Sequence, residues 1–184
     1  MPEEIIISYC SPTLAGIKTA NLFSLKVKSK QEGLDIARTL NKAIKAKGLC
    51  AIPLRYHKNA MQIYLYRPNK LQKDLSDPIA KKILMQKGYP CANIGKCICK
   101  LIQNITCSKA FPHEIGLFLG YPPSDVECFM NHSRTGVQCV GCWKAYSNKE
   151  AAENTFADYK NCTMQYKEAF KHGKTLAQLA VQVG

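Results

Sequence analysis

The sequence predicts an α+β fold, in which a small mixed or antiparallel sheet of about four strands is packed with several helices. The first observation behind this prediction is that β-forming segments alternate with segments of helical periodicity along the chain. The second is that two β-forming segments lie close enough in sequence to form a hairpin. The third is that no repeat, low-complexity tract or Gly/Ser linker interrupts the 184 residues, so we expect a single domain spanning 1–184.

The first half of the chain contains most of the predicted sheet. Leu22–Val27 has the composition of a strand, and Glu32–Lys47 carries a helical stripe of apolar residues that Gly48 ends. Leu49–Tyr56 and Ala60–Arg67 are rich in β-formers and are separated by three turn-forming residues. We therefore expect these last two segments to pair as a hairpin.

The second half of the chain is predicted to be mainly helical. Pro68 begins a helix that runs toward Gly88 and is interrupted at Asp77-Pro78, because proline removes a helical hydrogen bond. The remaining predicted elements are a helix over Ile94–Cys107, a helix over Pro123–Asn131, a strand over Val137–Tyr146, a long helix over Asn148–Lys171 and an apolar tail over Leu176–Val183.

Composition limits the classes of partner. The apolar fraction of 46% is ordinary for a folded domain, and no apolar run approaches the ~20 residues that span a bilayer, so we expect no membrane insertion. The net charge is 26 − 13 = +13, which suggests nucleic acid, an anionic surface or an acidic small ligand as partner. The lysines are spread along the chain and arginines number only four, so nucleic-acid binding rests on charge alone.

Ten cysteines occur in the chain. The start MPEEIIISYC lacks the basic region of a secretory signal, so we expect the protein in the cytoplasm. Cysteines in that compartment act as thiols, metal ligands or redox groups more often than as structural disulfides.

Cys10 is the first thiol candidate. We expect Ser11 to cap, and Pro12 to open, a helix whose positive end would stabilise the thiolate of Cys10, making it a catalytic nucleophile. The alternative is that Cys10 is a small buried hydrophobe. Thr13 and Lys18 follow on the same segment as ligand-binding candidates, although a solvated Lys18 is an equally simple interpretation.

The stretch FPHEIGLFLGYPPSD contains the second catalytic candidate, His113. We expect a helix to begin at Phe111-Pro112, so that His113 and Glu114 fall in its first turn and Gly120 ends it. The dipole there favours neutral imidazole, which accepts protons or binds metal, and it favours the Glu114 carboxylate.

Asp125 follows at the start of the next predicted helix. It is a candidate either for ligand binding and orientation of His113 or for a plain capping role. An HExxH zinc motif is absent, since no second histidine follows His113 at the required spacing.

The segment VQCVGCWKAY brings together thiols, an aromatic pair and a lysine. Trp143 and Tyr146 could stack on an aromatic ligand such as a flavin, nucleotide or tetrapyrrole, with Lys144 neutralising its phosphate or carboxylate. The alternative is a half-buried strand with Trp143 in the core and Lys144 in water. No dinucleotide, Walker or serine-hydrolase motif names a cofactor or reaction.

Cys139 and Cys142 form a C-x-x-C pair that lacks the second pair of a zinc ribbon. On a regular strand their side chains would point to opposite faces, unless Gly141 creates a bulge. Further ligands for a metal would have to come from Cys128, His132 or Cys162.

Several blocks together resemble one family. They are CSPTLAGIKTANLF, YLYRPNKLQKDL, FPHEIGLFLGYPPSDV, CVGCWKAY and YKNCT. The family they resemble occurs in clostridia and other anaerobic Firmicutes and is catalogued as domain of unknown function 3793. The resemblance implies a bacterial, cytosolic, single-domain protein and no particular activity.

The resemblance also marks motif positions in this chain. They are Cys10, Thr13, Lys18, His113, Glu114, Asp125, Cys139, Trp143, Lys144, Tyr146 and Cys162. Where the family reads C-x-G-Y-W-K-V-Y, this chain has Cys142 before Trp143 and Ala145 in the valine place. The resemblance therefore leaves Cys139 and Cys162 as the sulfurs for a metal.

These observations lead to one main hypothesis and two alternatives. The main hypothesis is a protein that binds a small anionic ligand or cofactor, with possible thiol chemistry, in a cleft framed by the Cys10–Lys18 segment, the His113 corner and the Trp143 strand. The first alternative is a metal- or haem-binding redox or iron-related protein. The second is a basic adaptor that binds nucleic acid or protein.

Overall fold

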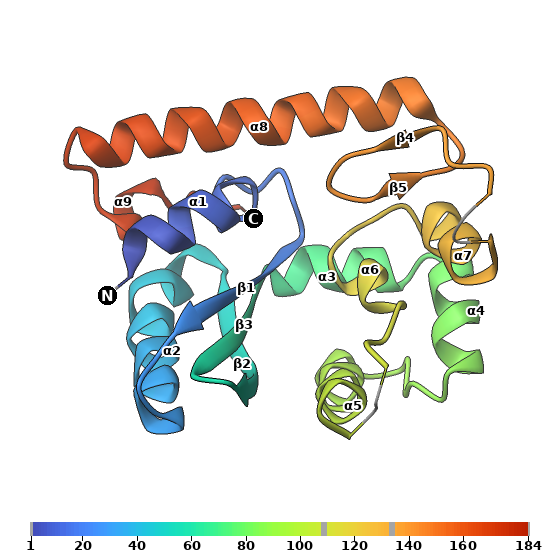
Figure 1. Cartoon of the computed structure of the whole chain (residues 1–184), viewed down its shortest axis with the longest axis horizontal. Coiled ribbons are helices and arrows are strands. Elements are labelled where there is room, and N and C mark those ends of the chain that lie inside the picture. Colours follow the sequence, from blue (N-terminus) through green and yellow to red (C-terminus); the bar gives the residue numbers. More distant parts are fainter. Residues whose placement is uncertain (1, 108–109, 133–134, 184) are drawn as a thin grey trace. The chain divides into compact units, whose positions relative to one another are not determined.

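A computed structural model describes residues 2–107, 110–132 and 135–183, which form two compact units (Figure 1). Unit 1 comprises residues 1–69 and 159–184, and unit 2 comprises residues 70–158. Helices and two antiparallel sheets, one of three strands and one of two, confirm the α+β class. Compact units within one chain can belong to a single domain, so the single-domain expectation stays a prediction.

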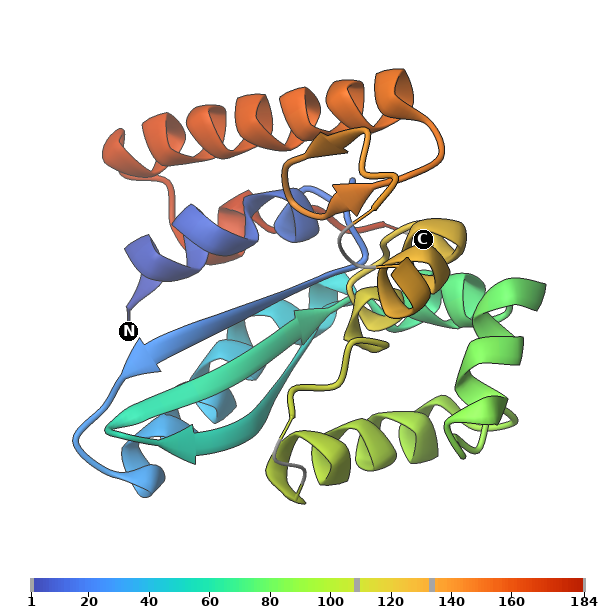
Figure 2. The ribbon, with the colours of Figure 1, turned by 45° about the vertical axis from the view of Figure 1, so that its right-hand side comes forward.

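The sheet of unit 1 contains the predicted hairpin. Its order is β1 (Ala20–Lys26), β3 (Ala60–Tyr66) and β2 (Cys50–His57), with both pairs antiparallel (Figure 2). The turn residues Lys58 and Asn59 both have positive φ, 47° and 58°, which is the backbone of the tight turn that matches strand twist. Both the first predicted strand and the hairpin are confirmed.

One face of this sheet carries the core of unit 1. Helices α1 (Glu3–Leu14), α2 (Lys30–Ile44) and α9 (Leu176–Leu179) contribute to the same buried cluster as the sheet, and η1 (Lys45–Lys47) continues α2. Alternate residues of the central and edge strands face this cluster, as the two-residue period of a strand requires. They are Phe23, Leu25, Met61, Ile63 and Leu65.

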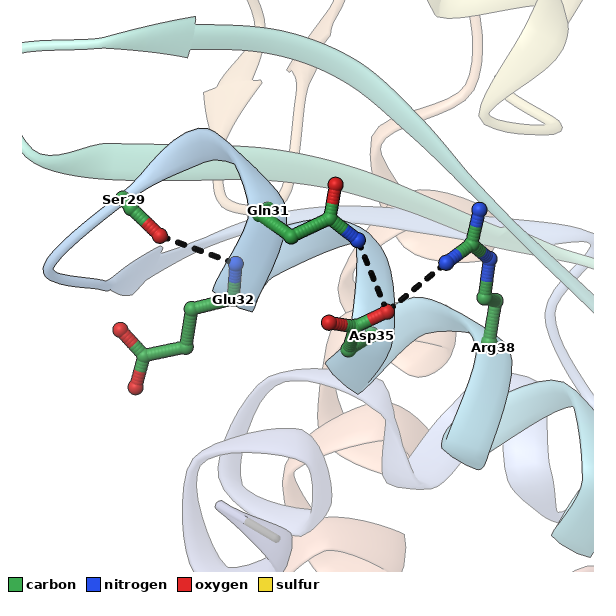
Figure 3. Close-up of polar contacts among 5 residues, drawn as sticks. All are labelled: Ser29, Gln31, Glu32, Asp35 and Arg38. Atoms are coloured by element: carbon green, nitrogen blue, oxygen red, sulfur yellow. Dashed lines mark hydrogen bonds and ion pairs between the residues drawn. The ribbon is translucent and has the colours of Figure 1, made fainter.

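The start of α2 is fixed by exposed polar contacts, shown in Figure 3. Ser29 Oγ accepts from the backbone N–H of Glu32 at 3.1 Å, as an N-cap does. Asp35 Oδ1 accepts from Gln31 at 3.0 Å and from Arg38 at 2.8 Å. Exposed contacts of this kind define where a helix begins and contribute little stability.

The expected helix opening at Pro12 is wrong. Instead α1 spans Glu3–Leu14 and contains Pro12 near its end. The side chains of Ile6, Cys10 and Leu14 lie on one stripe and are fully buried, and burial of each of the two larger ones, Ile6 and Leu14, is worth roughly 1.5–3 kcal/mol. Together these burials outweigh the ~3 kcal/mol that proline costs inside a helix.

Unit 2 is mainly helical. Asp77 caps α4 by accepting from the backbone N–H groups of Ile79 at 2.8 Å and Ala80 at 3.1 Å, which confirms the predicted interruption before Pro78. The helices are α3 (Pro68–Leu75), which begins in unit 1, α4 (Pro78–Gln86), α5 (Ile94–Cys107), α6 (Ile115–Phe118) and α7 (Pro123–His132).

The predicted strand over Val137–Tyr146 is wrong in its extent. The segment forms a hairpin of two short strands, β4 (Cys139–Val140) and β5 (Lys144–Ala145), before α8 (Lys149–Lys171) begins. A side chain at Gly141 would come within 2.3 Å of the Phe156 ring, so the chain reverses where only glycine can approach that ring. The alternating pattern of the segment is compatible with either arrangement.

The helix expected to begin at Phe111-Pro112 is shorter than predicted. The amide groups of Ile115 and Gly116 bond to carbonyls three residues earlier, so His113 and Glu114 form a turn and α6 begins only at Ile115. Gly120, with φ of +75°, ends this region as predicted. A helix of four residues has too small a dipole to support the argument that it keeps His113 neutral.

No helix among the described residues is long and apolar enough to cross a bilayer.

Candidate ligand-binding site

Unit 2 contains a hollow of about 340 Å³, which we call the aromatic hollow. Four of the predicted site residues line it: His113, Asp125, Trp143 and Lys144. The other lining residues are mostly aromatic or aliphatic; they are Phe111, Pro112, Ile115, Gly116, Tyr121, Val126, Phe129, Val140 and Gly141. A volume of this size suits a small organic molecule.

Trp143 forms a fixed part of this wall. The Tyr121 ring stacks on the indole with centroids 5.2 Å apart, and the Phe156 ring meets it at 73° with centroids 4.5 Å apart. Since Tyr121 stacks on the indole and Phe156 packs against it edge to face, both rings fix the position of Trp143 in the wall.

Asp125 holds the wall in place. Its Oδ2 accepts from the indole N–H of Trp143 at 2.8 Å. Its Oδ1 accepts from the backbone N–H groups of Tyr146 and Ser147, at 3.0 and 3.1 Å, and from the Ser147 hydroxyl at 3.0 Å. Asp125 therefore joins the first turn of α7 to the end of the β4–β5 hairpin.

This arrangement corrects two expectations for Asp125, the capping of α7 and the orientation of His113, while its ligand-binding role stays a prediction. The hydrogen-bond donors to the carboxylate come from Trp143, Tyr146 and Ser147, beyond α7. Within the described part of the chain, Asp125 therefore neither caps that helix nor forms a hydrogen bond with His113. Its side chain is buried and its negative charge is balanced by donors.

His113 and Lys144 are the basic side chains of the aromatic hollow. The exposed imidazole of His113 lies edge-on to the Phe129 ring, at 5.1 Å and 86°. The ammonium of Lys144 lies 5.5 Å from the centroid of the same ring. Phe129 thus positions both basic groups, and the hollow combines apolar walls with positive charge.

Close backbone approach shapes the hollow. A Cβ at Gly116 would lie 2.8 Å from a methyl carbon of Val126 and 3.2 Å from the Tyr121 ring. Contacts this short do not occur in folded proteins without displacement, so α6 and α7 need glycine here to pack as closely as they do.

The Cys10–Lys18 segment belongs to unit 1. Cys10 lies inside α1, is fully buried, and burial raises the pKa of its thiol despite the opposing charge of Lys18. The expected lowering of that pKa by a helix N-terminus is therefore wrong. The predicted nucleophilic role of Cys10 stays a prediction, without support from its surroundings.

Thr13 and Lys18 have contacts within unit 1. The Thr13 hydroxyl donates to Asn21 Oδ1 at 2.7 Å, and the Lys18 ammonium lies 5.6 Å from the centroid of the Tyr159 ring. Both side chains are buried. Because this segment belongs to unit 1 and His113 and Trp143 belong to unit 2, the cleft framed by all three stays a prediction.

The sulfurs proposed for a metal also fall in different units. Cys139 lies in unit 2, with Sγ 3.9 Å from the Lys149 carbonyl oxygen. Cys162 lies on α8 in unit 1, where burial raises the pKa of its thiol to about 11. The C-x-x-C partner Cys142 is exposed in the hairpin turn, and the side chain of His132 is outside the described residues.

Among the described residues, no three His, Cys, Asp or Glu side chains are grouped so as to hold a metal ion.

Two other candidates lie away from the aromatic hollow. Tyr146 is buried and contributes its backbone N–H to Asp125. Glu114 is buried beside a different hollow and accepts a hydrogen bond from the Tyr89 hydroxyl at 2.9 Å. Of the adjacent residues His113 and Glu114, His113 lines both hollows and Glu114 lines only the second.

The prediction missed Phe129, the ring that both basic groups contact. Phe129 follows Asp125 by four residues on a predicted helix, so the two share a helical face. That spacing was the available signal.

Comparison with known proteins found one family. No curated protein and no solved structure matched the chain. The model of the family described as "Protein of unknown function (DUF3793)" matches residues 6–180, which include most of both compact units. The chain belongs to this family.

Proposed function

We propose that this protein binds a small aromatic or apolar molecule carrying an anionic group, and that it does so in the aromatic hollow of unit 2. The observation that carries the proposal is the combination of apolar walls with His113 and Lys144 on the same ring, Phe129. Apolar walls with a few polar groups are typical of small-molecule sites.

The charge balance of the hollow supports an anion rather than a cation. Asp125 supplies a carboxylate among the lining residues, and that carboxylate already accepts four hydrogen bonds. A bound cation would therefore meet an occupied acceptor and two basic side chains. A carboxylate, sulfonate or phosphate group would instead gain a basic partner in a partly desolvated setting.

The proposal does not include a thiol. None of the residues that line the aromatic hollow is a cysteine. We further propose that the protein works in the cytoplasm, which is supported by ten cysteines that are all unpaired thiols in the described chain.

Trp143 provides the readout, because it is the single tryptophan of the chain and lines the hollow. The test is a titration of tryptophan emission with 3-phenylpropanoate, its neutral amide and the matching ammonium compound. We expect the anion to change Trp143 emission with saturation, and the amide to bind about ten-fold more weakly, the equivalent of ~1.4 kcal/mol.

Two matched variants separate the hollow from general basicity. Lys144→Gln should weaken binding of 3-phenylpropanoate about ten-fold. Lys96→Gln removes an exposed lysine of the same unit that does not line the hollow, and it should leave binding unchanged. Equal binding of the anion and the amide, or equal effects of the two variants, would reject the proposal.

A further inference from the structure

A second hollow of unit 2, of about 320 Å³, shares Phe111, Pro112 and His113 with the aromatic hollow. We call it the Glu114 hollow. Its other lining residues are Lys87, Asn104, Ala110, Glu114 and Met130. It therefore combines apolar side chains with one buried carboxylate.

The Glu114 carboxylate is held from one side. Its Oε1 accepts from the Tyr89 hydroxyl at 2.9 Å and is 3.5 Å from Asn104 Nδ2, which also donates to the Tyr89 hydroxyl at 3.0 Å. Since the carboxylate can only accept, this network orients the Asn104 amide with its NH₂ group toward Glu114 and Tyr89. The amide oxygen of Asn104 consequently lies on the other side.

Two acceptor oxygens remain unused. Glu114 Oε2 and Asn104 Oδ1 form no hydrogen bond with the described residues, although Glu114 is only 5% exposed. Among those residues, only one side-chain N or O atom is both inaccessible to solvent and without a hydrogen-bond partner. That atom is Gln62 Oε1, which belongs to unit 1. The two oxygens are therefore accessible, and both residues line the hollow.

Among the residues that the structure describes, no positively charged side chain forms an ion pair with the Glu114 carboxylate. Lys87 lines the hollow, but it is exposed and none of the ion pairs of the described chain involves it. His113 packs edge-on to Phe129. A buried carboxylate with a free oxygen and no cationic partner is costly, and a bound donor that carries positive charge would offset that cost.

We propose that the Glu114 hollow binds a primary ammonium compound with an apolar body. The ammonium group can donate to Glu114 Oε2, and the apolar body contacts Phe111, Pro112 and Met130. This site goes beyond the anion site proposed above and does not depend on it.

The test is calorimetric titration at neutral pH with 3-phenylpropylammonium and its neutral isostere 3-phenylpropan-1-ol. We expect the ammonium compound to bind at least about ten-fold more tightly than the alcohol. Glu114→Gln should remove this preference while keeping an acceptor for Tyr89, and Glu150→Gln, an exposed carboxylate of the same unit, should not.

Lys87→Gln should strengthen ammonium binding, whereas Glu114→Gln should weaken it. Loss of the neighbouring positive charge should tighten ammonium binding about two- to five-fold, and this variant leaves the Glu114 network intact, so it tests the site even if Glu114→Gln fails to fold. Equal binding of ammonium compound and alcohol, or weaker binding in Lys87→Gln, would overturn the proposal. The anion titration of Trp143 stands or fails separately.

Discussion

Asp125 shows how one buried carboxylate can organise the wall of a hollow through its hydrogen bonds. Its carboxylate binds the indole N–H of Trp143 and three donors from Tyr146 and Ser147. Hydrogen bonds to a buried charged acceptor are among the stronger ones in proteins, so we regard Asp125 as the residue that fixes the aromatic hollow.

Replacing Asp125 by Asn tests this role. The amide oxygen can still serve one set of donors, but the NH₂ group then opposes another donor, either the Trp143 indole or the Tyr146–Ser147 backbone. We expect a loss of about 2 kcal/mol in the free energy of unfolding, measured by urea denaturation followed by Trp143 emission. A change within about 0.5 kcal/mol, as is usual for exposed substitutions, would contradict the role.

The cysteines should differ in their rate of alkylation according to their burial. Burial raises the pKa of Cys97 and of Cys162 to about 11 each, and it also raises that of Cys10, so these groups stay protonated at neutral pH. Cys99 and Cys142 are exposed. Because thiolate is the reactive form, exposed cysteines should be alkylated first.

Mass-spectrometric mapping of iodoacetamide labelling in the native protein checks this order. Labelling of Cys10, Cys97 and Cys162 should be slow in the native protein at neutral pH and should become fast when the protein is unfolded. Rapid modification of Cys10 in native protein would contradict the burial argument and would revive Cys10 as a nucleophile.

At the residue scale, the sequence predicted which residues belong to a site better than it predicted their hydrogen-bond partners. His113, Trp143 and Lys144 were candidates because local motifs contain chemistry-bearing side chains, and all three line the hollow. The bond from Trp143 to Asp125 joins residues 18 apart in sequence, and no local periodicity reports such a pairing. Tyr89 and Asn104 were missed for the same reason.

At the element scale, the end of α1 illustrates tertiary capping. The guanidinium of Arg67 is buried and donates to the carbonyls of Thr13 and Leu14, each at 2.8 Å. It also donates to the carbonyls of Val181 at 2.7 Å and Lys47 at 3.2 Å. One side chain from the end of β3 thus satisfies the orphan carbonyls of a helix and ties two other segments, at Lys47 and Val181, to it.

Arg67→Met should therefore destabilise unit 1. We expect a loss of about 3 kcal/mol in the free energy of unfolding, because several buried carbonyls lose their donor together. Far-ultraviolet circular dichroism during urea denaturation provides the measurement. The matched control is Arg38→Met, which removes an exposed arginine paired with Asp35 and should cost less than about 1 kcal/mol; equal losses in the two variants would contradict this account.

Element prediction succeeded where local signals agree and failed where packing overrode them. The α2 helix and the β2–β3 hairpin were predicted because an apolar stripe ended by Gly48 favours a helix, and β-forming segments separated by turn residues favour a hairpin. Pro12 was misinterpreted as a helix start, since the burial of α1 against the sheet is not visible in the local sequence. The β4–β5 hairpin was missed because its strands are only two residues long.

At the scale of the whole molecule, the chain divides its predicted functional residues between two compact units. Unit 1 contains Cys10 and Cys162, and unit 2 contains His113, Trp143 and the aromatic hollow. Metal or haem binding and nucleic-acid binding stay predictions from the cysteine content and the net charge of +13. Gel retardation at rising salt addresses the second, since nonspecific binding falls steeply with ionic strength.

The central claim is that an apolar anion occupies the aromatic hollow, and intermolecular nuclear Overhauser effects test it most directly. With 3-phenylpropanoate bound, the account predicts cross-peaks from the ligand ring to the protons of Phe129 and Trp143, and loss of those cross-peaks in Lys144→Gln at the same ligand concentration. Cross-peaks confined to exposed apolar side chains elsewhere, such as Tyr9 and Met85, would contradict it.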